Sequence, residues 1–490
     1  MKKIIIGNNK YLVLEDIVLV ARKFASVSID LSAYKSISQN RSVLDKFIKQ
    51  RQIIYGINTQ FGNDIYKIDE NINLKNEKVY LASLEERQKN LIKSHNCGLG
   101  EKISNDIVRA TMLLRAQALS QGASGVRPII IQSLINFLNK KISPVIRRFG
   151  SVGASGDLIP LSSIAFALIS NKIKKYGLKP LQLEAKEGLA LINGTSFMTA
   201  IAALTLYDIT KLFPIMLSAL AISLEALLIA DSAYNPFVHQ LKKHHGQIEV
   251  NNFFKKFWRG SKLIDKNSLQ DYYSLRSIPQ GFGPFYENIK RATNWVENEI
   301  NSVNDNPIIR TNPPKIYHSA NFMGYYITET CDILKIDIAQ ASSWIHAVFA
   351  NLIHPRKNKG LPSNLIKNQN CNGFKALQIL AASLAVQNRK LTLPNQTVMI
   401  PTEGDNQDVN SLGTHAAFDL KEVYENLERL TAILLLAGIQ AIELRGIGKA
   451  SKKSKELWKI VRKEVPFLKN DKPLQKDLEK IISLIKEGKF

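Results

Sequence analysis

The chain has 490 residues, 45% of them hydrophobic and 22% charged, which is typical of a folded globular protein large enough for two or more structural units. Its net charge is +24, but lysine and arginine are spread along the chain and no nucleic-acid-binding motif accompanies the one dense basic run at residues 449–455, so we expect no nucleic-acid partner. Three widely separated cysteines, Cys97, Cys331 and Cys371, form no Cys-x-x-Cys pair, so we expect no disulfide framework, no metal site and a reducing, cytoplasmic location.

The predicted elements begin with a short strand at residues 4–6, because polar residues end the apolar stretch too early for a signal peptide. Apolar residues then recur at helical spacing over long segments, which are residues 107–119, 129–138, 197–212, 327–352, 374–386 and 423–443. Residues 212–230 are the most apolar long segment, but they contain Pro214 and Glu225, so we expect a buried helix and no membrane span. The pattern predicts a mainly α fold built on a long central helical bundle.

Four loops rich in glycine, asparagine or proline interrupt the helices, at residues 55–63, 149–156, 304–314 and 401–413. We place a domain boundary near Gly194. Residues 1–194 form a smaller N-terminal domain in this interpretation, and residues 195–490 form the long-helix bundle.

The segment Gly-Ser-Val-Gly-Ala-Ser-Gly-Asp-Leu-Ile-Pro at residues 150–160 carries the strongest chemical signal. If the amide nitrogen of Gly156 attacks the carbonyl carbon of Ala154, a five-membered ring closes. Loss of two waters, including the Ser155 hydroxyl, then leaves an electrophilic 4-methylideneimidazol-5-one group. A turn followed by a helix start is the simpler interpretation. The tripeptide alone is a weak signal, because a second copy stands at Ala123-Ser124-Gly125.

Further motifs accompany this segment. They are Tyr55-Gly56-Ile57-Asn58-Thr59-Gln60-Phe61-Gly62, Asn90-Leu91-Ile92-Lys93-Ser94-His95, Leu191-Ile192-Asn193-Gly194-Thr195, Gln270-Asp271-Tyr272-Tyr273-Ser274-Leu275-Arg276, Asn321-Phe322 and Asn406-Gln407-Asp408-Val409-Asn410-Ser411-Leu412-Gly413. In this order, over nearly the whole chain, they resemble the ammonia-lyases and aminomutases that use this self-made group, including the histidine, phenylalanine and tyrosine ammonia-lyases. The resemblance implies a small aromatic amino acid as substrate, no external cofactor, and a homotetramer that builds each site from several subunits.

Tyr55 resembles the family's catalytic base, and its loop between Gly56 and Gly62 suits a mobile lid. A tyrosine with its ordinary pKa of about 10 is mostly protonated at neutral pH, so we expect the local field to favour the phenolate. Arg276 resembles the carboxylate clamp, since a guanidinium can bind a carboxylate through two hydrogen bonds. A packed loop tyrosine and a surface ion pair are the simpler interpretations of these two residues.

The resemblance assigns the remaining site residues to the reactive loop and to the substrate. Asn193, Ala154, Ser155, Gly156, Tyr273 and Phe322 join Tyr55 in the catalytic set, and His95, Gln270, Gln407 and Glu403 join Arg276 in the substrate-binding set. Phe322 is also compatible with a plain core position.

His95 resembles the selectivity position of histidine enzymes and of one branch of bacterial tyrosine enzymes, although a plain core histidine fits the pattern too. The histidine enzymes typically have Asn-Gln-Glu-Asp near Gln407, and this chain lacks that glutamate. We therefore expect L-tyrosine, giving coumarate, to be preferred over L-histidine, giving urocanate. An aromatic aminomutase would need the same residues, and a non-catalytic helical scaffold would need none of them. Gln60, Ala320 and Met323 depart from the usual glycine, glycine and histidine; we expect Gln60 to stiffen the lid and Met323 to alter how the ring sits.

Overall fold

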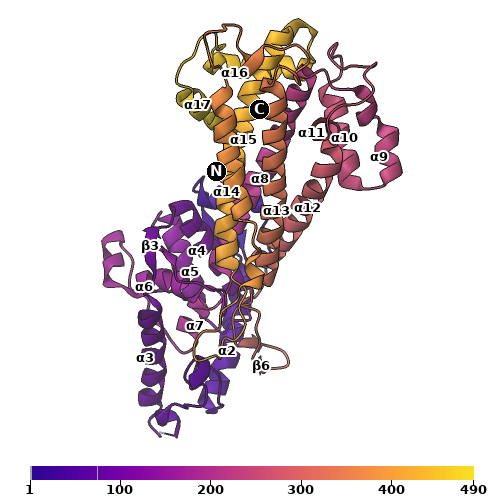
Figure 1. The fold of residues 1–490 in the computed structure, drawn as a ribbon. Coiled ribbons are helices and arrows are strands. Elements are labelled where there is room, and N and C mark those ends of the chain that lie inside the picture. Colours follow the sequence, from indigo (N-terminus) through magenta and orange to yellow (C-terminus); the bar gives the residue numbers. More distant parts are fainter. Residues whose placement is uncertain (1–2, 74) are drawn as a thin grey trace. The chain divides into compact units, whose positions relative to one another are not determined.

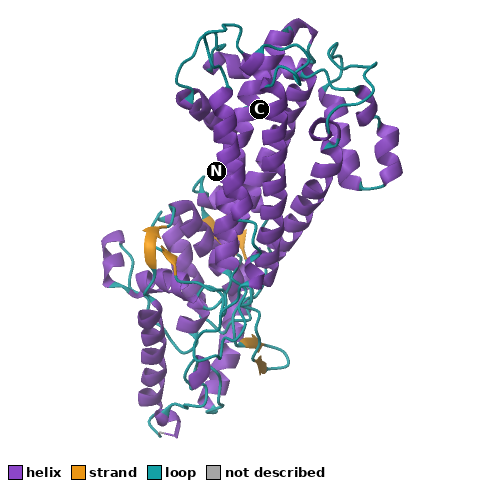
Figure 2. Ribbon diagram, in the orientation of Figure 1, coloured by secondary structure: helices purple, strands orange, loops and turns teal. Residues whose placement is uncertain are grey.

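The computed structural model describes residues 3–73 and 75–490, and helices dominate it (Figure 2). The prediction of a mainly α fold is confirmed. Strands occur only as three two-stranded pairs in this described part of the chain. The strand predicted at residues 4–6 is β1 (Ile4–Ile6), which pairs in parallel with β2 (Val27–Ile29).

All the predicted helices are present, and several are longer than their apolar periodicity indicated. They are α4 (Asn105–Leu119), α5 (Pro128–Asn139), α8 (Ser196–Ala226), α13 (Tyr325–Ile353), α14 (Lys375–Lys390) and α15 (Gly413–Arg445). Residues 197–212 and most of 212–230 form one helix, because α8 continues through Pro214. The predicted loop at residues 304–314 contains strand β5 (Ile308–Arg310), which pairs with β6 (Lys315–Tyr317).

The described chain groups into two compact units (Figure 1). Unit 1 consists of Met1–Tyr207, Thr293–Cys331 and Pro394–Phe418; unit 2 consists of Asp208–Ala292, Asp332–Leu393 and Asp419–Phe490. Both units are discontinuous, because α8, α12 (Ile278–Ile300), α13 and α15 each pass from one unit to the other. The boundary near Gly194 stays a prediction.

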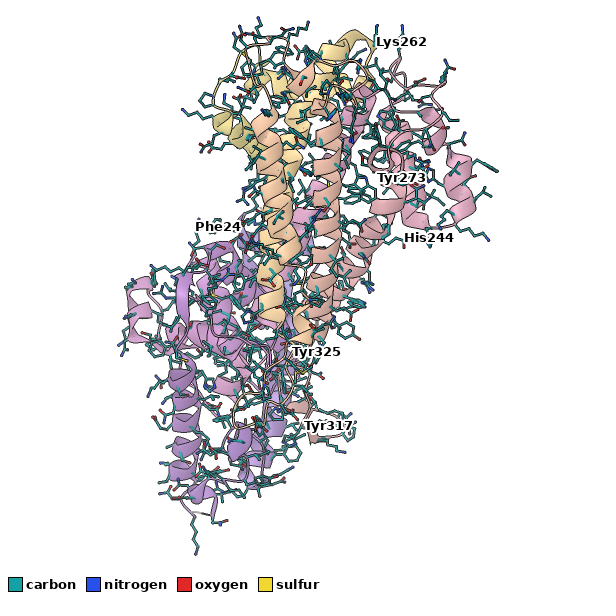
Figure 3. All side chains as sticks on the ribbon, viewed as in Figure 1. Phe24, His244, Lys262, Tyr273, Tyr317 and Tyr325 are labelled. Carbon is teal, nitrogen blue, oxygen red and sulfur yellow. The ribbon has the colours of Figure 1, made fainter. Side chains whose placement is uncertain are left out.

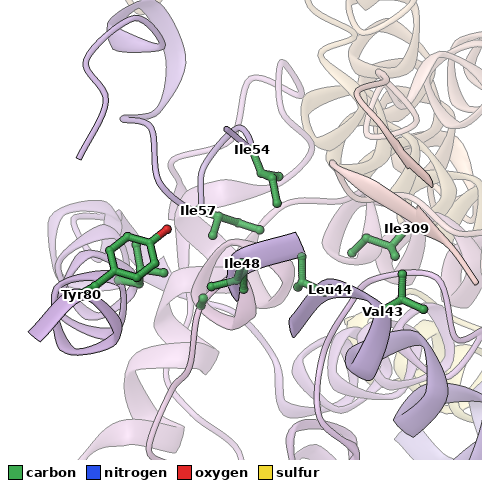
Figure 4. Packing of buried hydrophobic residues seen from close by; sticks show 9 residues of the cluster. Val43, Leu44, Ile48, Ile54, Ile57, Tyr80 and Ile309 are labelled. Carbon is green, nitrogen blue, oxygen red and sulfur yellow. The ribbon is translucent and has the colours of Figure 1, made fainter. Parts of the chain in front are cut away.

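Within unit 1, α4 packs between α1 (Leu14–Ala21) and α5, and every residue from 107 to 119 is buried. Helix α3 (Glu77–His95) packs against α6 (Leu158–Ile169) and α7 (Glu187–Ile192). Figure 4 shows a hydrophobic cluster that joins α2 (Leu31–Lys49) to Ile54, Ile57, Tyr80 and Ile309. The remaining strands, β3 (Leu99–Lys102) and β4 (Arg147–Phe149), pair in antiparallel orientation.

Unit 2 contains the larger parts of α13, α14 and α15, which Asn388 links through hydrogen bonds to Ser342 Oγ and the Val423 carbonyl. Its shorter helices are α9 (Pro236–Lys242), α10 (His245–Phe257), α11 (Tyr273–Arg276), α16 (Lys452–Glu464) and α17 (Gln475–Lys486). Of the described helices, α8 alone is long and apolar enough to cross a membrane, and 78% of its apolar window is buried inside the protein.

Candidate active site

A cavity of about 300 Å³ in unit 1 gathers residues from distant parts of the chain. Eight of the predicted site residues line it: Tyr55, His95, Ala154, Ser155, Asn193, Phe322, Glu403 and Gln407. Gly156 directly follows two lining residues. These residues lie far apart in the sequence and come together only in the folded chain.

The loop that carries Tyr55 is anchored in the core on both sides. Ile54 and Ile57 are fully buried in the hydrophobic cluster of Figure 4. The amide of the buried Gln88 on α3 donates to the Gly56 carbonyl at 2.9 Å and accepts from the Leu189 backbone on α7. Packed residues therefore hold the backbone on both sides of Tyr55 in place, and Tyr55 itself lines the cavity.

The surroundings of the Tyr55 hydroxyl do not favour the phenolate within a single chain. Burial raises the pKa of the phenol above its ordinary value, the Gly62 N–H that donates to the hydroxyl at 3.0 Å opposes this, and the Glu403 carboxylate raises the pKa further. The expectation of a field that favours the phenolate is therefore wrong for this chain alone. The physical reason is burial of the hydroxyl, to which the nearby Glu403 carboxylate adds.

The Ala154-Ser155-Gly156 loop has a backbone that only glycine allows at its third position. Gly156 has φ of +70°, and a Cβ built there would lie 2.1 Å from the Gly194 carbonyl oxygen. The same pair of residues forms a parallel β-bridge, and the Asp157 N–H donates to the Gly194 carbonyl at 2.8 Å. Gly153 also has a positive φ, and its carbonyl accepts from Ser411. The turn at this loop is therefore tight and depends on glycine at residue 156.

Asp157 fastens this loop to the start of α8. Its fully buried carboxylate accepts hydrogen bonds from the backbone N–H groups of Phe197 and Met198 and from the hydroxyls of Ser151 and Thr414. Burial raises the pKa of the Asp157 carboxyl, and these four donors oppose that shift. The carboxylate therefore acts as a structural acceptor that is saturated with donors.

Two amides contact the central residue of the tripeptide. The Asn193 Nδ2 donates to the Ser155 carbonyl oxygen at 2.8 Å, and the Gln407 Nε2 donates to the Ser155 hydroxyl at 3.1 Å. The oxygen of the Gln407 amide accepts from the Thr402 hydroxyl at 2.6 Å. Both amides are therefore oriented by their other partners, and both direct their N–H groups at Ser155.

His95 ends α3 at the edge of the cavity. Its Nδ1 lies 2.9 Å from the Leu91 carbonyl oxygen. In the tautomer with its hydrogen on Nδ1, this nitrogen donates to the carbonyl and Nε2 is an acceptor; the Ser94 hydroxyl also lies 3.2 Å from Nδ1. A substrate ring that offers an O–H or N–H donor suits such a histidine.

The cavity contains charged groups of one sign. The carboxylates of Glu403 and Asp408 line it, and no lysine or arginine is among its described lining residues. The motif glutamate is replaced by Gln407, as the sequence indicated, but Glu403 and Asp408 still place carboxylates at the cavity that could pair with an imidazole.

Sequence reasoning missed several lining residues, among them Leu91, Leu189, Asn306, His318, Asn406 and Asp408. His318 is the most informative of these, because its Nε2 accepts the Tyr55 backbone N–H at 3.4 Å and burial lowers its pKa. Its place three residues before the Asn321-Phe322 motif was an available signal. The sequence offers no comparable signal for Leu189, which reaches the cavity only through the packing of α7 against α3.

Three predicted site residues lie elsewhere. Gln270, Tyr273 and Arg276 belong to unit 2, and none of these described residues lines the cavity. Tyr273 is 75% exposed (Figure 3), and the Arg276 guanidinium lies 4.7 Å from its ring centre. In the same segment, the Asp271 carboxylate accepts a hydrogen bond from the Ala230 N–H, which holds the segment in place.

Comparison with known proteins gives a consistent result. A family model described as aromatic amino acid lyase matches residues 12–463. A relative named histidine ammonia-lyase from Alkaliphilus metalliredigens is 35% identical, covering 99% of this chain and 97% of its own. Among solved structures, a tyrosine aminomutase from Streptomyces globisporus has a TM-score of 0.92 at 29% identity, over 100% of this chain and 97% of its own. Histidine ammonia-lyase from Trypanosoma cruzi has a TM-score of 0.90 at 29% identity, over 100% and 94%.

A helical fold of this kind, with a cavity built around a glycine-rich Ala-Ser-Gly turn, defines an enzyme of the carbon–nitrogen lyase class. The chain belongs to the aromatic amino acid lyase family. The sequence relatives are named histidine ammonia-lyase, so they do not support the preference for tyrosine predicted from the sequence. In the described residues, no group of three or more histidine, cysteine, aspartate or glutamate side chains could hold a metal ion.

Proposed function

We propose that the protein is a histidine ammonia-lyase, which converts L-histidine to urocanate and ammonia. The observation that carries this proposal is the pair of carboxylates, Glu403 and Asp408, in a cavity that also holds His95. Carboxylates can accept hydrogen bonds from an imidazole and favour its protonated form. The full-length relatives named histidine ammonia-lyase support the same substrate.

The reaction breaks a C–H bond at the carbon β to the carboxylate and the C–N bond of the α-amine, and forms a carbon–carbon double bond. Tyr55 is the proton acceptor in this proposal, through its phenolic oxygen. Asn193 and Gln407 hold the reactive loop through their contacts with Ser155. His95 and the cavity carboxylates orient the substrate ring.

We propose that the 4-methylideneimidazol-5-one group forms from residues 154–156. The positive φ of Gly156, its approach to Gly194 and the saturation of Asp157 fit a loop already bent for cyclisation. When formed, the group supplies an electrophilic carbon that converts the substrate's amine into a better leaving group. The Asn193 contact fits as well, because the Ser155 carbonyl oxygen is retained in the ring.

Wild-type protein is expected to release ammonia faster from L-histidine than from L-tyrosine or L-phenylalanine. The two cavity carboxylates can pair with a positively charged imidazole, whereas a phenyl ring offers them no donor and a phenol carries no positive charge. The measurement is ammonia release with the ultraviolet spectrum of each product acid. Coumarate forming faster than urocanate at equal substrate concentration would return the assignment to tyrosine, and a β-amino acid product would indicate an aminomutase.

Tyrosine is the second candidate, favoured by the neutral Gln407 motif and by a His95 Nε2 that can accept from a phenol. Replacing His95 with phenylalanine tests both candidates. An unpaired polar group in an apolar pocket costs about 1 to 3 kcal/mol, so this variant should lose preference for whichever polar ring the wild type uses and gain it for phenylalanine.

We further propose that a homotetramer completes each site with residues Gln270 to Arg276 of another copy. An amino acid substrate carries a carboxylate, which needs a cationic partner, and the described lining residues of the cavity include no arginine or lysine. Arg276 in its exposed segment is suited to this task, because its planar fork binds a carboxylate through two hydrogen bonds.

Mixing two inactive variants tests the sharing of sites. Tyr55→Phe and Arg276→Met should each be nearly inactive alone, but random mixed tetramers should regain activity at about a quarter of their sites, because one chain supplies Tyr55 and another Arg276. Co-expression with two different tags isolates the mixed species. Activity no greater than that of the separate variants would show that both residues come from the same chain.

A further inference from the structure

The second Ala-Ser-Gly copy has a defined structural environment. The Ser124 hydroxyl donates to Asp305 Oδ1 at 2.9 Å, and the Ile309 N–H donates to the Ala123 carbonyl at 2.8 Å. Ala123, Ser124 and Gly125 are not among the described residues that line the cavity. The second copy is therefore hydrogen-bonded to the chain segment around Asp305, and the Ser124 hydroxyl already has an acceptor.

Asp305 is also paired with a buried cation. Lys186 Nζ lies 2.6 Å from Asp305 Oδ2, and both side chains are fully buried. Burial lowers the pKa of Lys186, and the Asp305 carboxylate opposes that shift. Taking two charges out of water is costly, and packed apolar residues often stabilise a protein equally well. A structural role alone gives this pair no clear advantage.

Both members of the pair control segments that meet at one active-site residue. Asp305 directly precedes Asn306, whose N–H donates to Asn193 Oδ1 at 2.8 Å. Lys186 is the residue before α7, and α7 leads into Asn193. Because Oδ1 of Asn193 is occupied by this N–H, its Nδ2 points at the Ser155 carbonyl oxygen.

We propose that Ser124, Asp305 and Lys186 form a positioning cluster that orients the Asn193 amide on the Ala154-Ser155-Gly156 loop. The cluster touches neither substrate nor loop and acts through Asn306 and α7. This assignment rests on the proposed function of the loop, and it gives the second Ala-Ser-Gly copy a task that differs from cyclisation.

The test removes both charges together, in a Lys186→Met/Asp305→Asn double variant of the full chain. Removing both charges leaves neither Lys186 nor Asp305 as an unpaired buried charge, and Asp157 remains as a charge beside the buried Arg115, so the fold should be retained. The control is Lys335→Met/Asp332→Asn, because Lys335 and Asp332 form a buried pair at 2.8 Å in unit 2; this variant also removes the 3.4 Å contact of Lys335 with the partly exposed Asp419. Thermal unfolding shows whether both double variants remain folded.

Two readouts decide the result. The first needs no substrate: it is the fraction of chains that are lighter than the translated sequence by two waters. The second is the pair of kinetic constants kcat and KM, with kcat calculated per chain that has lost the two waters. In the Lys186→Met/Asp305→Asn variant we expect a lower cyclised fraction, or a fall in kcat of about 10- to 100-fold with KM nearly unchanged, as for misplacement of a catalytic group. The control should keep the wild-type values of both.

A folded variant with wild-type cyclisation and wild-type kcat would overturn the proposal. If the double variant fails to fold, Ser124→Ala decides, because it removes one hydroxyl and no charge. Its kcat should fall about 2- to 10-fold, the equivalent of one hydrogen bond, and an unchanged kcat would overturn the positioning role. A wild-type protein without the two-water loss would instead contradict the proposed function itself.

Discussion

Replacing Ser155 with alanine is expected to abolish the electrophile and nearly all turnover. The variant can still fold, because the turn depends on Gly156 and on the four donors to Asp157, none of which changes. Without the hydroxyl, however, no second water can leave and no methylidene carbon forms. The loss of turnover should exceed the contribution of about 100- to 10,000-fold that a single acid–base group typically makes, because the substrate's amine would lack its activation.

Intact-protein mass is the measurement for this prediction. The wild type should be lighter than its translated sequence by two waters, and Ser155→Ala should not show this loss. The chain offers a matched control in Ser124→Ala, which alters an identical tripeptide whose hydroxyl is bound to Asp305, and which should still lose two waters. A wild-type protein at full unmodified mass would refute the electrophile mechanism.

Helical periodicity predicted the central helices well, because their residues are buried on most faces and apolar residues recur at every turn. It failed at their ends. Helix α15 begins at Gly413, whereas the apolar pattern begins at residue 423. Helix α8 continues through Pro214, so burial of this helix outweighs a cost of about 3 kcal/mol. Local propensity is a weak guide where tertiary packing is extensive.

The candidate site could be predicted wherever a residue belongs to a recognisable motif. Tyr55, Ser155 and Asn193 meet at one cavity as expected. The sign of the Tyr55 pKa shift could not be predicted, because it depends on burial and on the carboxylate of Glu403, more than 300 residues away in sequence. The contact of His318 with the Tyr55 backbone also arises only in the folded chain, although its place near the Asn321-Phe322 motif was a signal that this residue belongs to the site.

The structure and the proposed chemistry differ most in the protonation of Tyr55. Burial and Glu403 raise its pKa, so the phenolate is scarce at neutral pH in the single chain. A base that works as its phenolate becomes more abundant as pH rises. Wild-type kcat/KM is therefore expected to increase from neutral toward alkaline pH, and a cation near the hydroxyl, such as Arg276 of a neighbouring copy, would move that increase to lower pH.

Tyr55→Phe should keep the two-water mass loss and the KM of the wild type but lose about 100- to 10,000-fold in kcat, because only the proton acceptor is removed. The Gly62 N–H that donates to the hydroxyl loses its partner, which should cost about 1 kcal/mol of stability and leave the fold intact. The measurements are steady-state kinetics across pH, intact mass and thermal unfolding. The alkaline rise of kcat/KM should disappear with the hydroxyl. Turnover close to that of the wild type, with the pH profile retained, would reject Tyr55 as the base and direct attention to the other titratable groups that line the cavity, which are His95, His318, Glu403 and Asp408.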